Sequence, residues 1–167
     1  MAYSNGLLAV LLAASPVLAD EMEFQGHVIE AQGVADARLA LRVRGLRYAI
    51  PGSPEQVVGK AQACLTRRDS GAGVVSVDAA GGRLIAVSRV EYRSDPLPGT
   101  IKGRLVVEAA GGGFSVVLSN LGVMQGPTAD GADEVFAPLL LRGDSGWEAA
   151  LSAVIGVKQA LVDCMFS

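Results

Sequence analysis

The sequence is poor in the side chains that build catalytic and metal sites. Its 167 residues include one histidine, His27, and two cysteines, Cys64 and Cys164. Zinc sites use several histidine or cysteine ligands, so the usual sets cannot be assembled. There is no Cys-x-x-Cys pair for redox chemistry and no Gly-x-Ser-x-Gly elbow to complete a triad with His27. The sequence therefore predicts no catalytic residue, no cofactor and no metal ligand, and it weighs against an enzyme.

Two further motifs lack the residues that a ligand needs. The acidic stretch at residues 130–134 does not have the spaced oxygen ligands of an EF-hand loop. The glycine clusters at residues 81–82 and 111–113 lack the lysine and the following helix of a phosphate-binding loop. We interpret the first as a solvated loop and the other two as hairpin turns.

The chain also lacks an excess of positive charge. It has 14 lysine and arginine residues against 17 aspartate and glutamate residues, a net charge of -3. Nucleic-acid binding depends on a basic surface that neutralises phosphates, so no nucleic-acid partner is expected. Half of the residues are hydrophobic, and no segment after residue 19 reaches transmembrane length. This composition predicts a globular domain that does not span a membrane.

The first nineteen residues have the pattern of a cleavable secretory signal. The apolar run Gly6–Ala14 is followed by a segment that ends in small residues, which predicts cleavage between Ala19 and Asp20. The run is too short to cross a hydrocarbon core of about 30 Å. The alternative is a buried helix of a cytosolic domain. We expect a signal peptide over residues 1–19 and a single periplasmic or secreted domain over residues 20–167.

The first half of the mature chain predicts two strands and a helix. Alternating residues indicate strands over 22–30 and 38–50. In the second strand Gly45 predicts a bulge that returns Leu46, Tyr48 and Ile50 to the apolar face. A helix then begins at Ser53, with Pro54 at its first position and Gln56 completing a capping box.

The second half predicts an antiparallel meander and a closing helix. Glycine turns separate strands over 74–78, 83–92, 100–108 and 113–121. Residues 122–146 form a long connection with a turn of helix, after which Asp144 or Ser145 caps a helix over 147–165. Lys158 falls within the apolar arc of that helix, and its stem is expected to snorkel toward water. The predicted fold is α+β, with a curved antiparallel sheet and two helices on one face; a helix-grip fold is the alternative.

The two cysteines lie one on each predicted helix, at the edge of each apolar stripe. Helices packed side by side on one sheet would bring these edges together. In an exported protein an even pair of cysteines favours oxidation, which predicts a Cys64–Cys164 disulfide. The alternative is two buried free thiols.

The other face of the sheet is predicted to carry arginines around an apolar centre. Cross-strand pairing with Glu91 and Glu108 would make it an ordinary solvated surface. Because arginine is enriched in interfaces, the alternative and more specific interpretation is that this face binds a partner. Its expected members are Arg42, Arg44, Arg83, Ile85, Val87, Arg89, Arg104 and Val106.

This order of elements resembles a family of exported bacterial domains of unknown function with a TBP-like fold. The resemblance is carried by the Ser53–Arg67 helix, the Lys102–Glu108 and Gly113–Asn120 hairpin, and the final helix, and it covers most of residues 38–167. It implies a curved sheet with two helices on one face, and it brings no activity or site residues.

We therefore expect a non-enzymatic exported domain that binds an envelope protein or component through its open sheet face. The alternative is a carrier of a small apolar ligand, held in a cavity between the sheet and the helices. A pocket between these layers would favour the carrier, whereas a packed core would favour the partner.

Overall fold

The computed structural model describes residues 19–34, 37–67, 70–95, 98–125 and 135–167. Residues 1–18 of the predicted signal peptide and the whole acidic stretch at 130–134 lie outside these ranges. The predicted cleavage point adjoins the first strand, because β1 begins at Asp20.

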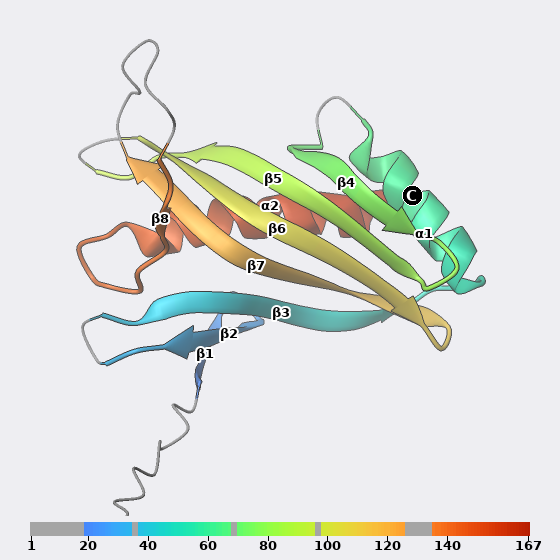
Figure 1. Ribbon diagram of the computed structural model, residues 1–167, viewed down its shortest axis with the longest axis horizontal. Coiled ribbons are helices and arrows are strands. Elements are labelled where there is room, and N and C mark those ends of the chain that lie inside the picture. The colour runs from blue at the N-terminus through green and yellow to red at the C-terminus, as the bar shows by residue number, and fades with distance from the viewer. Residues whose placement is uncertain (1–18, 35–36, 68–69, 96–97, 126–134) are drawn as a thin grey trace, which may run out of the picture.

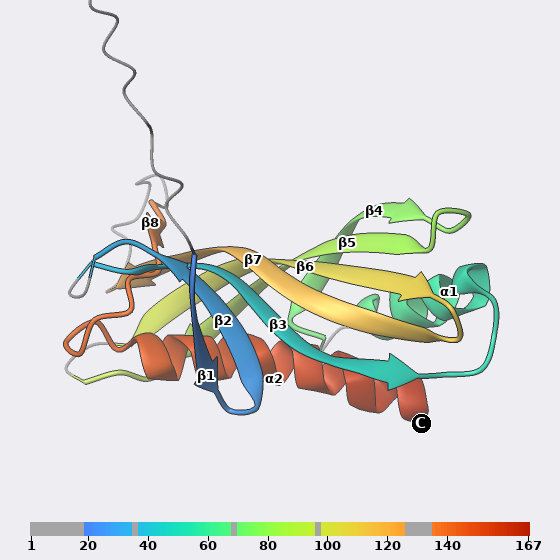
Figure 2. The same ribbon diagram turned by 90° about the horizontal axis from the view of Figure 1, so that it is seen from below.

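Eight antiparallel strands form one sheet, and two helices lie on one of its faces (Figures 1 and 2). The strand order is β1-β2-β3-β7-β6-β5-β4, with β8 paired to β7. The predicted α+β class, the meander of β4 to β7 and the placement of both helices on one face are confirmed. The elements are β1 (Asp20–Phe24), β2 (His27–Gln32), β3 (Leu39–Ala49), α1 (Pro54–Leu65), β4 (Ala72–Asp78), β5 (Arg83–Tyr92), β6 (Gly99–Ala110), β7 (Gly113–Gln125), β8 (Ala137–Pro138) and α2 (Trp147–Phe166).

The hydrophobic core lies between the sheet and the two helices. α2 packs on β5 and β6, α1 packs on β4, β5 and β6, and the two helices touch each other. α1 has the predicted capping box, in which Gln56 N–H donates to the Ser53 hydroxyl and Ser53 N–H donates to the Gln56 side chain. The largest apolar side chains that are fully buried are Phe114, Ile29, Leu84, Ile101, Leu105, Leu118, Leu139, Leu151 and Met165.

The first predicted strand is in fact a hairpin. The chain turns at Gln25 and Gly26, which have φ angles of 50° and 71°, and Phe24 pairs with His27. Two consecutive left-handed residues make the tight turn whose twist matches antiparallel strands. The prediction of one continuous strand over 22–30 was wrong because its apolar residues continue through this turn.

The bulge predicted in β3 is present, but its effect on one side chain differs. The pairing of β3 with β7 shifts between Arg44 and Arg47. Tyr48 and Ile50 return to the core side, whereas Leu46 is 70 % exposed. Gly45 still faces the core, since a Cβ atom at this position would point at Lys158 and His27. The bulge therefore shifts the inward-facing positions only after Leu46, and not before it as the sequence predicted.

The long connection before α2 contains a short strand, β8, that the sequence did not predict. Within the described part, Leu139 N–H donates to the Leu121 carbonyl at 3.0 Å, and Ala40 N–H donates to the Leu139 carbonyl at 3.0 Å. Residues 137–141 thus lie between the ends of β7 and β3. α2 then starts after Gly146, which has a φ of 65° and no side-chain cap, so the predicted Asp144 or Ser145 cap was wrong.

One helix among the described residues, α2, is long and apolar enough to cross a membrane by length and composition. The sequence prediction that no segment after residue 19 reaches this length was therefore wrong. Half of the apolar window is buried inside the fold, including Leu151 and Val154 against the sheet. In this structure α2 is the central core helix.

Candidate functional site

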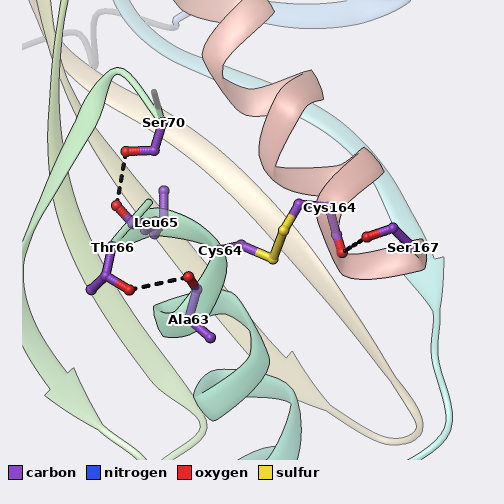
Figure 3. The surroundings of a disulfide bond; sticks show 7 residues. All are labelled: Ala63, Cys64, Leu65, Thr66, Ser70, Cys164 and Ser167. Atoms are coloured by element: carbon purple, nitrogen blue, oxygen red, sulfur yellow. Dashed lines mark hydrogen bonds between the residues drawn. A yellow bond between two sulfur atoms is a disulfide. The ribbon is translucent and has the colours of Figure 1, made fainter. Parts of the chain in front are cut away.

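The predicted disulfide joins the two helices. Cys64 of α1 and Cys164 of α2 are bonded, with their Cα atoms 5.9 Å apart (Figure 3). A Cα separation of this size is ordinary for a disulfide. Around it, the Ser70 hydroxyl donates to the Leu65 carbonyl and the Ser167 hydroxyl donates to the Cys164 carbonyl. The bond ties together chain segments that are 100 residues apart in sequence.

The predicted arginine-rich residues do share the outer face of the sheet. One row runs across four strands, since Val87 pairs with Arg104, Arg104 with Ser119, and Ser119 with Arg42. In the next row Ile85 pairs with Val106. The apolar centre is less exposed than expected, because Ile85 and Val87 are half-buried and Val106 is only 7 % exposed.

The arginines of this face differ in how they are paired. Arg44 lies 2.5 Å from Glu21 and 2.7 Å from Glu30. Arg42 lies 3.8 Å from Glu30, and Arg83 lies 3.9 Å from Glu108. These last two distances are near the limit for an ion pair, and exposed pairs contribute little stability. Of the two carboxylates that the sequence suggested as partners, Glu108 lies near Arg83, whereas Arg44 is paired with Glu21 and Glu30, which the sequence did not indicate.

An open groove of about 630 Å³ lies on the outer face, where β3 and β7 separate and the segment around β8 fits between them. Phe136 forms part of its wall and lies over Gly122, where even a Cβ atom would come within 3.1 Å of the phenylalanine Cβ. The Phe136 ring centre is 5.6 Å from Lys102 Nζ. The lining is mostly apolar and consists of Leu39, Ala40, Leu41, Val87, Lys102, Gly103, Arg104, Asn120, Leu121, Gly122, Phe136 and Pro138.

A second hollow, of about 280 Å³, adjoins this groove at Arg104. Its lining is mostly polar and contains three arginines and one glutamate. The Nε atom of Arg104 is buried and has no hydrogen-bond partner among the described residues. The other members are Arg42, Arg83, Val106, Glu108, Val117 and Ser119. The two hollows together make one surface with an apolar end and a cationic end.

A separate polar cluster is enclosed between β2, β3 and α2. Lys158 Nζ lies 2.8 Å from His27 Nε2 and 3.4 Å from the Tyr48 hydroxyl. Lys158 is 1 % exposed, so the predicted snorkelling was wrong. Its ammonium points at the sheet because Gly45 leaves room there: a Cβ at that position would lie 2.0 Å from Nζ.

The hydrogen bonds of this cluster fix the form of the histidine. His27 Nδ1 lies 2.8 Å from the Gln25 carbonyl, which can only accept, so Nδ1 carries the proton. Nε2 then accepts from Lys158 in the neutral ring. Burial lowers the pKa of Lys158, and burial together with the nearby Lys158 charge lowers the pKa of His27. Lys158 and His27 are both buried, so the side chains around them enclose this cluster.

Sequence reasoning missed the residues that shape the groove. Phe136 falls in the predicted connection over residues 122–146, and Ser119 and Lys102 fall in predicted strands without any distinguishing pattern. No local pattern marks them, because their proximity depends on the pairing of β7 with β3, β6 and β8. Alternation along single strands, as in Arg83, Ile85, Val87 and Arg89, is the signal that the sequence offers for the outer face.

A small hollow lies between the two helices, beside the disulfide. Among the hollows lined by described residues, the one beside the disulfide has a volume of about 90 Å³. Sites for small molecules usually have volumes of several hundred Å³. In the described part of the chain no group of three His, Cys, Asp or Glu side chains is placed to hold a metal ion.

The fold defined by this sheet and helix pair is TBP-like. The chain is similar to a DUF4468 family protein from Bacteroides ovatus, with a TM-score of 0.57 and 13 % identity over 88 % of this chain and 91 % of that one. It is also similar to a TBP-like protein from Parabacteroides distasonis, with a TM-score of 0.53 and 13 % identity over 87 % of this chain and 97 % of that one. No protein-family model and no curated protein matches the sequence. At this identity the likeness is one of fold, and it agrees with the TBP-like architecture that the sequence predicted.

Proposed function

We propose that this chain is a non-enzymatic binding domain that acts outside the cytoplasm and binds a partner protein through the outer face of its sheet. The observation that carries the proposal is the pair of adjoining hollows on that face, which share Arg104. One is mostly apolar and the other is lined by three arginines. Protein interfaces commonly combine an apolar centre with arginine and aromatic residues.

The packed core favours this reading over an apolar-ligand carrier. Leu84, Leu105 and Leu151 are completely buried between the sheet and α2. These fully buried side chains support a close-packed layer among the described residues rather than a ligand cavity. The groove beside Phe136 and the hollow at Arg104 lie instead on the side of the sheet away from the helices, where a partner can reach them.

The disulfide supports the location. Disulfides persist in oxidising compartments and are rare in the cytosol of most organisms. The bond between Cys64 and Cys164 therefore fits a periplasmic or secreted protein with a cleaved signal. Intact-mass measurement of the protein purified from the cell envelope or medium tests this. We expect a chain that starts at Asp20 and has no free thiol.

The binding face is tested by affinity capture with three forms of the mature protein. The first is the wild type, the second carries Val87→Glu and Arg104→Glu, and the third carries Lys60→Glu. Lys60 is exposed on α1, on the opposite side of the sheet. We expect proteins captured by the wild type to be lost with the double variant and kept with Lys60→Glu. Identical captured sets for all three folded forms would contradict the proposal.

A further inference from the structure

The outer face contains two arginines on either side of one serine. In the paired register Arg42 of β3 and Arg104 of β6 both lie opposite Ser119 of β7. Directly paired side chains on one sheet face have Cβ atoms about 5 Å apart. Two long cationic side chains therefore flank a short hydroxyl, and the space above the serine is accessible to both.

A third cation reaches the same hollow. Arg83 of β5 lines it together with Arg42, Arg104 and Ser119. Glu108 is the single carboxylate of the lining and lies 3.9 Å from Arg83. Three positive charges against one negative charge give the hollow a positive balance on a chain whose net charge is -3. Like charges gathered on one sheet face repel each other unless an anion lies between them.

The arginines also retain hydrogen-bonding capacity. Arg104 Nε is buried without a hydrogen-bond partner among the described residues, a situation that normally costs stability. Glu30, which is 3.8 Å from Arg42, is closer to Arg44 at 2.7 Å. A carboxylate can accept two parallel bonds from a guanidinium, so arginine clusters suit this group.

We infer that Arg42, Arg83, Arg104 and Ser119 bind a carboxylate of the partner, and that an apolar side chain of the same segment lies in the adjoining groove beside Phe136. The inference rests on the proposed function, since it concerns the same face. Arg104 lines both hollows, which places the two parts of the ligand side by side. Both hollows are open along the sheet, so an extended peptide segment fits them better than a lipid tail, which needs an enclosed cavity.

The test uses the mature, oxidised protein and a defined set of eight-residue peptides that have an amidated C-terminus and an uncharged BODIPY label. Each peptide carries one glutamate and one phenylalanine separated by one to four glycine or serine residues, and each has a partner peptide with glutamine in place of glutamate. Fluorescence anisotropy reports binding. We expect at least one spacing to bind, and its glutamine form to bind at least about tenfold more weakly.

The protein variants locate the carboxylate. Arg104→Gln and Arg42→Gln are expected to weaken binding of the best glutamate peptide at least about tenfold, and to leave the glutamine peptide almost unchanged. Lys60→Gln removes the same charge from α1 and should change the affinity less than about twofold. Circular dichroism and a thermal melt check that each variant is folded.

The outcomes distinguish a wrong carboxylate site from a wrong binding face. If glutamate and glutamine peptides bind equally, and Val87→Glu abolishes binding while Arg104→Gln does not, the face binds peptides but has no carboxylate site. If peptides bind and neither variant matters, both ideas are wrong. If no peptide binds, or sodium decanoate binds and no peptide does, the assignment of a peptide ligand is overturned.

Discussion

Removal of the disulfide should cost the domain a large part of its stability. The double variant Cys64→Ala, Cys164→Ala opens a link between segments 100 residues apart. On the chain-entropy model a loop of this length contributes about 4.7 kcal/mol to the free energy of unfolding. Domains are typically stable by about 5–15 kcal/mol in total. The variant is therefore expected to keep its fold at low temperature and to unfold far more easily.

Urea denaturation measures this effect. With a slope of about 2 kcal/mol per molar urea, a loss of 4.7 kcal/mol lowers the unfolding midpoint by about 2 M. Trp147 reports global unfolding, since it packs against Phe24 at the end of α2 away from Cys164. Wild-type protein in a reductant should behave like the variant, and the variant should not respond to the reductant. Midpoints within about 0.5 M of each other would refute the reasoning.

Three further predictions concern the buried polar cluster of His27, Tyr48 and Lys158. Burial lowers the pKa of Lys158, so below pH 10.5 the unfolded chain binds more protons than the folded one. The free energy of unfolding of the wild type should therefore rise between pH 7 and 10.5, and by more than that of Lys158→Met. Urea titrations at each pH measure this difference. The pKa of His27 is also lowered, so below pH 6.5 the unfolded chain binds more protons and the free energy of unfolding falls. Between pH 7 and 5.5 the variant His27→Gln should therefore lose less of its free energy of unfolding than the wild type. A Cβ on Gly45 would meet Lys158, so Gly45→Ala should lower the free energy of unfolding by about 1–3 kcal/mol. Gly59→Ala, in open space on α1, should instead raise it by about 0.5–1 kcal/mol; equal effects of the two alanines would contradict the account.

Much of the fold could be predicted from local pattern. The Ser53 capping box, the apolar spacing of α1 and the alternation of β5 each depend on neighbouring residues alone, and each is present. The Cys64–Cys164 disulfide could be predicted because each cysteine lies on one of two helices that pack on the same sheet face. Errors arose where the apolar pattern did not distinguish between structures, as at the Gln25–Gly26 turn.

The site could be predicted only in part. Alternation along single strands placed Arg42, Arg83 and Arg104 on one face, but it could not show that Arg42 and Arg104 flank the same serine. That arrangement depends on how β7 pairs with β3 and β6. The direction of Lys158 depends likewise on Gly45, which is over a hundred positions away in sequence and removes the side chain that would block it.

Photo-crosslinking in living cells shows directly whether the outer face of the sheet binds the partner. A benzophenone amino acid replaces Val87 in the groove or Lys60 on α1, and products are resolved by mass. We expect a discrete crosslinked product from position 87 that disappears with Arg104→Glu, and no matching product from position 60. The same product from position 60, or one from position 87 that persists with Arg104→Glu, would contradict it.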